Sequence, residues 1–232
     1  MASLQLRGTP GATCFRNQIQ RPWGRQLDLG NAGNTPRTAP KLDRLLSASA
    51  ALMARQGFSQ TSIRNVARET GFSLGGMYYY FENKEDLLFK IQQRTFSDLI
   101  AVQEDAVSAD GDAKARLRRF IRNHLAYFIS HFAELKVCTF ELESLQGERF
   151  TAIAQLRRRY FNCLAAVIGE LLGADPAAAR SDGRIRRKTL FVFGMLNWIF
   201  MWYDPERDSS VEAVGDEMVS LVLEGLHGES PA

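Results

Sequence analysis

The sequence predicts an all-α protein, and three observations on the 232-residue chain lead to this fold class. Apolar residues recur at the three- and four-residue spacing of amphipathic helices through most of the chain after Lys41. No stretch alternates apolar and polar residues for long enough to form a half-buried strand. The composition, 45% hydrophobic and 24% charged, is that of a chain that folds around a core. We therefore expect helices packed on helices.

The predicted organisation has four parts. Residues 1–40 mix Gly, Arg, Asn, Thr and Pro without periodicity, and such a segment cannot repay its ordering entropy, so a disordered basic arm is expected. A three-helix domain is expected at 41–86, a larger helical domain at 87–226, and a tail at 227–232. The five arginines of the arm either contact an anionic partner or remain solvated: Arg7, Arg16, Arg21, Arg25 and Arg37.

Several protein classes are disfavoured by what the sequence lacks. No apolar core of a signal peptide precedes the domains, and the longest apolar run, 190–203, is shorter than the roughly 20 residues that cross a bilayer. The three cysteines are widely spaced, which argues against disulfides and a zinc site. Nucleophile-elbow, zinc-protease and phosphate-loop motifs are absent. We expect a cytoplasmic protein that is not an enzyme and needs no cofactor or metal.

The first predicted helices are short and have local start and stop signals. Apolar residues at helical spacing from Leu42 to Met53 predict a helix that ends at Gly57, since glycine favours the left-handed conformation that terminates helices. Thr61 or Ser62 can cap a second helix that runs through Glu69.

The next residues have the spacing of a helix-turn-helix. Ala67 is small where two helices would cross, Gly71 permits a left-handed turn, and Met77 can plug the third helix, 73–80, onto the second. Asn83 is expected to cap a fourth helix. This geometry would place a recognition helix in the major groove of DNA, whereas the alternative is two short helices packed into some other bundle.

Long helices are predicted in the remainder of the chain. Apolar stripes cover 117–132 and 150–172, and a strongly apolar helix is expected at 184–203. Ser209 and Glu212 have the spacing of a capping box that opens the last helix.

The N-terminal domain resembles the TetR family (TetR/AcrR-type) of transcriptional regulators. The resemblance implies a dimeric repressor that binds double-stranded operator DNA and is released by a small hydrophobic effector; an activator, or a DNA-binding protein without an effector, is the alternative. The residues that carry it are Gly57-Phe58, Thr61-Ser62-Ile63-Arg64-Asn65-Val66-Ala67, Gly71-Phe72-Ser73, Tyr78-Tyr79-Tyr80-Phe81-Glu82-Asn83-Lys84 and Leu87.

The resemblance also assigns the DNA-contacting residues. Arg64 is expected to read a guanine edge, because its guanidinium matches the two acceptors that guanine presents in the major groove. The start of the recognition helix is apolar and glycine-rich, so thymine methyls and close backbone approach are expected there. The full predicted set is Thr61, Ser62, Arg64, Ser73, Leu74, Gly75, Gly76, Tyr78, Tyr79, Tyr80 and Lys84.

The segment 194–205 resembles a TetR subgroup that responds to acyl-CoA or fatty-acid-derived effectors; a drug-efflux repressor with another hydrophobic effector is the alternative. Either arginine cluster, 157–159 or 184–188, could receive a CoA phosphate or could remain solvated. His124 and Asn197 either orient a ligand or are satisfied core residues. The predicted pocket contains Phe120, His124, Phe128, Phe140, Tyr160, Asn197 and Trp198.

A homodimer is expected because the helix at 185–203 is apolar nearly all round and needs partners on both sides. With the last helix it would form a four-helix contact across a two-fold axis. The helix that begins at Lys84 would carry an effector-induced shift to the DNA-binding end. The predicted interface contains Trp202, Val211, Val214, Met218, Leu221 and Val222.

Overall fold

The computed structural model describes residues 39–108, 110–175 and 181–227, and this part of the chain is helical without a strand. Residues 1–38 of the predicted arm, with its five arginines, lie outside the described residues, as do residues 228–232. The predicted arm and tail are each too long where the structure describes them, because Ala39 and Pro40 begin the first described helix and His227 ends the last one. None of the described helices combines the length and apolarity that crossing a bilayer demands.

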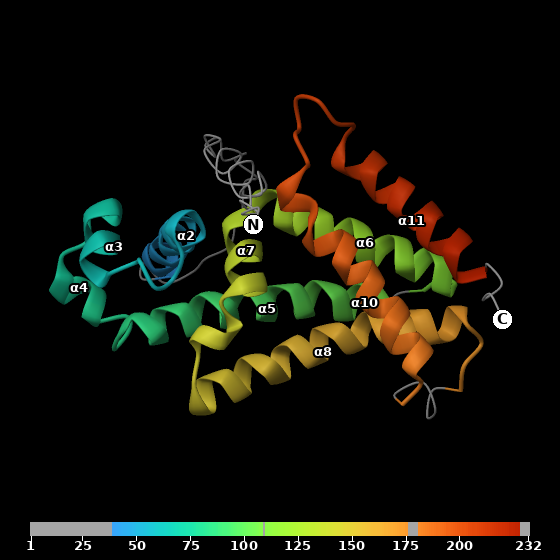
Figure 1. Cartoon of the computed structure of the whole chain (residues 1–232), viewed down its shortest axis with the longest axis horizontal. Helices are drawn as coiled ribbons and strands as arrows, with labels where there is room; N and C mark the ends of the chain where they lie inside the picture. The colour runs from blue at the N-terminus through green and yellow to red at the C-terminus, as the bar shows by residue number, and fades with distance from the viewer. Residues whose placement is uncertain (1–38, 109, 176–180, 228–232) are drawn as a thin grey trace, which may run out of the picture. The chain divides into compact units, whose positions relative to one another are not determined.

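The described helices follow one another with short connections (Figure 1). In chain order they are α2 (Ala39–Gln56), α3 (Ile63–Thr70), α4 (Leu74–Tyr78), α5 (Lys84–Ser108), α6 (Ala113–Ser130), α7 (Phe132–Phe140), η2 (Leu142–Ser144), α8 (Gly147–Leu171), α10 (Gly183–Asn197), η3 (Ile199–Met201) and α11 (Val211–His227).

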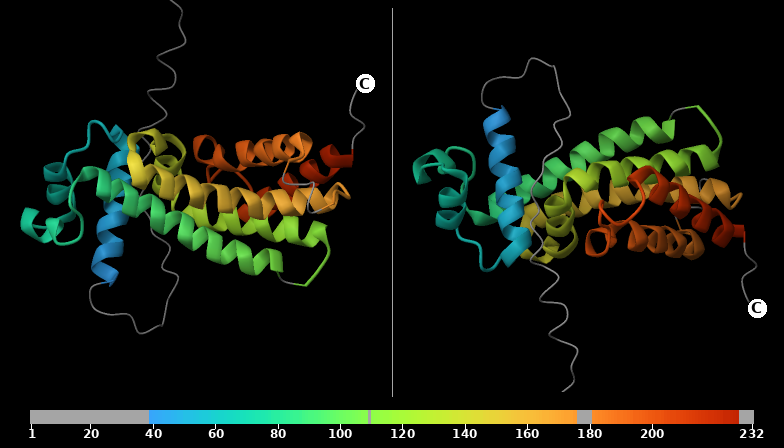
Figure 2. Two further views of the ribbon diagram at one scale, coloured as in Figure 1. Left: turned by 90° about the horizontal axis from the view of Figure 1, so that it is seen from below. Right: turned by 90° about the horizontal axis from the view of Figure 1, so that it is seen from above.

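These helices form a small head and a larger body. The head consists of α2, α3 and α4, which gather around the start of α5 (Figure 1). In the body, α5, α6 and α8 pack on one another, and α10 lies on the side of α6 and α8 that faces away from α5 (Figure 2). The short α7 packs on both α2 and α5, so it contacts head and body at once.

Local caps define the short helices of the head, as the sequence predicts. The Ser62 hydroxyl accepts a hydrogen bond from the Asn65 amide at 3.1 Å, and Gly71 ends α3 at a φ of 73°. Ser73 caps α4 through the Gly76 amide, and Asn83 caps α5 through the Asp86 amide. Each cap satisfies an amide that the first helical turn leaves unpaired.

Three predicted boundaries are wrong. The recognition helix α4 ends at Tyr78 rather than near Tyr80. The apolar helix expected at 184–203 ends at Asn197 and is followed by the 3-10 turn η3. Ile199 and Phe200 are buried in this turn, so burial of the apolar run does not require that the α-helix continue. The last helix begins one residue later than predicted, since Ser210 rather than Ser209 accepts the Ala213 amide at 3.3 Å.

A histidine and a tyrosine meet in the centre of the body. His124 is fully buried and its Nδ1 lies 2.8 Å from the Tyr160 hydroxyl. Burial lowers the pKa of His124 to about 3, although the Leu196 carbonyl acts in the opposite direction. Burial also raises the pKa of Tyr160. Both side chains are therefore neutral near pH 7.

The depressed pKa of His124 predicts a loss of stability in acid. The unfolded chain takes up a proton near pH 6.5 and the folded chain does not until about pH 3, so stability falls as the pH drops through this window. Going from about pH 7.5 to about pH 5 should lower the free energy of unfolding by about 2 kcal/mol through this residue alone. Urea denaturation of wild type and His124→Gln at both pH values measures the difference. An equal pH dependence in the two proteins would contradict the assignment.

Candidate DNA-binding surface and effector cavity

The contact between α3 and α4 has the helix-turn-helix geometry that the sequence predicts. Val66 and Met77 are fully buried, and Ala67 is nearly so. The Gly71 amide donates to the Ala67 carbonyl at 3.0 Å, which closes the turn between the helices. The small residue, the left-handed glycine and the apolar plug thus act together to fix the orientation of α4 on α3.

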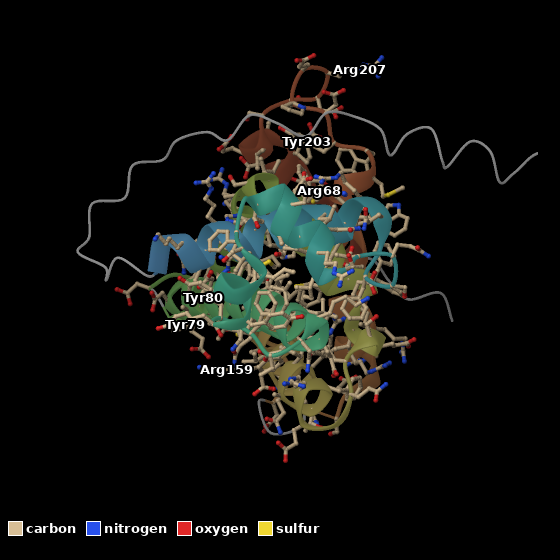
Figure 3. All side chains as sticks on the ribbon, turned by 90° about the vertical axis from the view of Figure 1, so that its left-hand side faces the viewer. Arg68, Tyr79, Tyr80, Arg159, Tyr203 and Arg207 are labelled. Atoms are coloured by element: carbon tan, nitrogen blue, oxygen red, sulfur yellow. The ribbon has the colours of Figure 1, made fainter. Side chains whose placement is uncertain are left out.

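Exposed cationic and aromatic side chains lie on this pair of helices. Arg64 and Arg68 are both exposed on α3, and within the described ranges no carboxylate comes within 4 Å of either guanidinium. Tyr78 is 54% and Tyr79 78% exposed. Figure 3 looks onto this end of the molecule and labels Arg68, Tyr79 and Tyr80. Arg68 was not predicted, although its four-residue spacing from Arg64 places both on one face of α3.

The first residues of α4 are exposed, and two of them are glycines. Leu74 is 41% exposed and Gly75 is exposed. A Cβ atom added at Gly75 would meet nothing within 4 Å, whereas one at Gly76 would lie 3.1 Å from the Ser73 hydroxyl oxygen. Contacts within the chain thus explain the glycine at 76 but not the glycine at 75.

Other predicted DNA contacts have partners within the head. Thr61 is buried and its hydroxyl donates to the Gly57 carbonyl at 2.8 Å. The Lys84 ammonium donates to the Phe58 carbonyl at 2.9 Å and lies 4.2 Å from the centre of the Phe58 ring. Tyr80 is partly buried and packs edge-on against Phe72 and Tyr79. Thr61 and Lys84 therefore hold the loop that positions α3.

A cavity of about 300 Å³ lies inside the body. Five helices contribute to its wall, namely α5, α6, α7, α8 and α10. A larger hollow of about 490 Å³, between α5 and α8, is more open to solvent. The residues that line the smaller, partly enclosed cavity are Phe96, Leu99, His124, Phe128, Leu135, Cys138, Thr139, Arg157, Arg158, Tyr160, Phe161, Leu190, Phe193 and Asn197.

The cavity includes four of the seven predicted pocket residues. His124, Phe128, Tyr160 and Asn197 line it. Phe120 lies behind the wall, with its ring centre 5.5 Å from that of Tyr160. The remaining two lie elsewhere: Phe140 and Trp198 are about half exposed and contact each other edge-on, with their ring centres 6.4 Å apart.

Arg157 brings a positive charge to this mostly apolar wall. Its Nη1 donates to the Cys138 carbonyl at 2.5 Å, and its guanidinium carbon lies 5.7 Å from the centre of the Phe96 ring. No carboxylate of the described residues forms an ion pair with it. Burial lowers the pKa of Arg157, with the Cys138 thiol acting in the opposite direction. The guanidinium nevertheless keeps its charge in a protein interior. Arg157 is thus a partly buried positive charge without an anionic partner among the described residues.

Several polar contacts join the body to the head, among them those of Arg94 in α5 with Asp43 and Ser47 of α2. At the end of α7, the Glu141 carboxylate accepts the Phe58 amide at 3.1 Å, and the Glu141 carbonyl accepts the Gln92 amide nitrogen at 3.2 Å. In α8, the Arg149 guanidinium lies 3.1 Å from Glu82 and 3.7 Å from Asp86. The end of α7 and the first turns of α8 therefore contact the segments that enter α3 and α5.

A set of large apolar side chains remains exposed on α10, beside η3 and on α11. We call it the outer apolar face, and it comprises Leu190, Phe191, Trp198, Trp202 and Leu221, which are between 43% and 67% exposed. Of the predicted interface residues, Trp202 and Leu221 belong to this face and Val211 is partly buried. Val214, Met218 and Val222 are buried instead, on the helix that packs on α6 within the same chain.

Comparisons with known proteins agree with this geometry. The chain is 22% identical to the fatty acid metabolism regulator protein of Bacillus subtilis over 82% of its own length and 97% of that protein. A TetR-family transcriptional regulator from Bordetella parapertussis superposes with a TM-score of 0.73 at 25% identity, covering 82% of this chain and 98% of that chain. AibR, crystallised with isovaleryl coenzyme A and operator DNA, superposes with a TM-score of 0.66 at 22% identity, covering 78% and 97% of the two chains.

Two family models match the chain. The model of the bacterial regulatory proteins of the tetR family matches residues 45–91, and that of the tetracyclin repressor-like C-terminal domain matches residues 110–226. The matched regions contain the helix-turn-helix and four of the five helices that line the cavity. The chain therefore belongs to the TetR family of bacterial transcriptional regulators.

Proposed function

We propose that this protein is a homodimeric repressor, acting in the cytoplasm, whose head binds operator DNA until an acyl effector occupies the cavity in the body. The observation that carries the proposal is the helix-turn-helix with two exposed arginines, joined through α7 and α8 to a partly enclosed cavity. Exposed cations beside a recognition helix supply the phosphate and base contacts that operator binding needs.

The proposed DNA contacts follow from exposure and charge. Arg64 is at the start of α3 and is proposed to read a base edge, while Arg68 one turn later is proposed to contact phosphate. Tyr78 and Tyr79 supply hydroxyls that remain accessible. Ser62 and Ser73, with Leu74, Gly75 and Gly76, form the edge that approaches the groove.

An acyl effector is supported by the cavity and by the relatives. Aromatic and aliphatic side chains make up the larger part of its wall, and polar groups such as His124, Arg157 and Asn197 lie among them, which is the usual character of a site for a small ligand with an apolar part. The names of the relatives refer to fatty acid metabolism and to isovaleryl coenzyme A. The cavity volume of about 300 Å³ suits the acyl group rather than a whole coenzyme.

The outer apolar face supports the homodimer. Large exposed apolar residues that lie together on one protein mark a surface that another protein covers. A two-fold contact between two copies of this face would bring two heads to one palindromic operator. The proposed interface consists of the outer apolar face, with Val211 at its edge.

Replacing Arg64 should relax operator specificity. In Arg64→Ala, binding to an operator selected from random duplexes should weaken by about 1 to 3 kcal/mol, and preference at one base pair should disappear. Arg68→Ala should instead weaken binding to all sequences alike and reduce the slope of the salt dependence by about one. Fluorescence anisotropy at several salt concentrations measures both. If Arg64→Ala lowered affinity uniformly, Arg64 would be a phosphate contact.

Adding a methyl group at Gly75 should raise the stability of the protein and lower its affinity for the operator. Gly75→Ala removes a helix-disfavouring glycine and should raise the free energy of unfolding by up to about 1 kcal/mol. Because the added methyl would lie between α4 and the groove, operator affinity should fall by roughly ten-fold. Gly225→Ala, which adds a methyl to an open position in α11, is the control that should leave operator affinity unchanged. Unchanged operator affinity in Gly75→Ala would exclude close approach there.

A charge on the outer apolar face should break the dimer. Phe191 is 67% exposed in the single chain, so Phe191→Glu should leave the protomer folded while removing a central apolar contact between copies. Sedimentation velocity should show a monomer. Val102→Glu, at a 46% exposed apolar residue of α5, should remain dimeric. A dimeric Phe191→Glu protein, or a monomeric wild type, would place the interface elsewhere or remove it.

A further inference from the structure

The one cationic side chain that reaches across from the cavity wall to the backbone of α7 is Arg157, among the residues that the structure describes. It lines the cavity, and its Nη1 donates to the Cys138 carbonyl at 2.5 Å. That carbonyl belongs to the last turn of α7, where helix carbonyls have no amide partner within the helix. A guanidinium at this position satisfies the carbonyl and interacts favourably with the negative end of the helix dipole.

The end of α7 also contacts the loop of the head that precedes α3. Glu141 follows the helix directly, and its backbone amide donates to the Val137 carbonyl at 3.0 Å. Its carboxylate accepts the amide of Phe58, in the loop before α3, and also the Ser144 hydroxyl at 2.8 Å. A change in the last turn of α7 would therefore move the acceptor on which the loop of the head depends.

Arg157 is also suited to a ligand. A partly buried cation without a carboxylate partner favours an anionic or strongly polar oxygen that enters the cavity, because a charge-assisted hydrogen bond is stronger than one to a neutral carbonyl. The wall also contains the apolar side chains Phe96, Leu135 and Phe161, together with the neighbouring Arg158. This combination fits the acyl oxygen of an aliphatic acid, followed by its hydrocarbon chain.

We propose that Arg157 is the effector-sensing residue: in the free protein it holds the last turn of α7, and it exchanges the Cys138 carbonyl for the acyl oxygen of the effector. This inference rests on the proposed function and adds the residue that links effector binding in the cavity to operator binding by the head. Release of the Cys138 carbonyl loosens the last turn of α7, and Glu141 then no longer holds the Phe58 loop in the position that DNA binding requires. The ligand thereby favours the state with low operator affinity, which is the differential interaction that a population shift needs.

The size of the cavity indicates the length of the chain. At roughly 30 Å³ for a water-sized group, a cavity of about 300 Å³ has room for on the order of ten non-hydrogen atoms. Eight carbons with their acyl oxygens fill this space. The acyl oxygen is either the carboxylate of a free acid or the carbonyl of a thioester, and octanoate and octanoyl-CoA distinguish these two sources.

The test measures effector binding and the opening of α7 separately, and neither readout needs an operator. Calorimetric titrations with octanoate and with octanoyl-CoA should show binding of at least one of them to the wild-type dimer, and 1-octanol, which lacks the acyl oxygen, should bind at least ten-fold more weakly. Arg157→Met should weaken binding roughly ten-fold or more, and Arg157→Lys should recover part of it because the charge returns. Arg122→Met, which removes an exposed arginine that pairs with Asp216, is the matched control.

Hydrogen exchange measures the second half of the proposal. Without ligand, the amides of residues 139–142 should exchange faster in Arg157→Met than in wild type or Arg122→Met, and the binding ligand should accelerate them in wild type. Glu141→Ala should keep the ligand affinity within about two-fold but remove the effect of the ligand on exchange of the Phe58 amide, which has then already lost its acceptor. Unchanged exchange at the end of α7 in Arg157→Met would overturn the proposal. So would wild-type affinity of that variant for the ligand, or failure of both octanoyl compounds to bind. A wild-type protein that passes these tests without binding any operator would refute the proposed function alone.

Discussion

The hydrogen bond from the Phe58 amide to the Glu141 carboxylate is the contact through which we propose that the cavity acts on the head. It joins residues 83 positions apart in the chain and connects the loop before α3 to the end of α7. The preceding turn of α7 lines the cavity through Cys138 and Thr139. A partly buried backbone amide favours keeping its acceptor, so in our proposal the loop follows Glu141 when α7 moves.

Other polar contacts also hold the head against the body, beside the apolar packing of α2 on α5 and α7. Lys84 ties the start of α5 to the Phe58 carbonyl, and Arg149 links α8 to Glu82 and Asp86. These are polar contacts near the surface, each of modest net free energy. Allosteric coupling between two sites typically amounts to about 1 to 3 kcal/mol, and the exchange of one or two such contacts is enough to supply it.

Local signals explain why the head could be predicted from the sequence. Gly71, Ser62 and Asn83 act on their own neighbours, and the structure shows each in the predicted role. Contacts between residues far apart in the chain have no such local signal in the sequence. The partner of Lys84 is a carbonyl 26 residues earlier, and the arginine run that includes Arg157 has the same appearance whether solvated or buried.

Periodicity also does not say which neighbour an apolar face meets. Met218 was predicted to face a second subunit, yet it is buried within its own chain, whereas Leu221 of the same helix is 61% exposed. The helix expected to reach Tyr203 ends at Asn197. The prediction was too long because an apolar run in the sequence does not distinguish a helix from a buried turn.

Reciprocal linkage tests the central claim, that the cavity and the DNA-binding head are coupled, most directly. Operator affinity is measured with and without saturating octanoyl ligand, and ligand affinity is measured with and without saturating operator. A coupled protein must show the same factor in both directions, because the coupling free energy is a property of the pair of sites. We expect equal factors of at least about five. Ligand affinity that is identical on free and operator-bound protein would contradict the account.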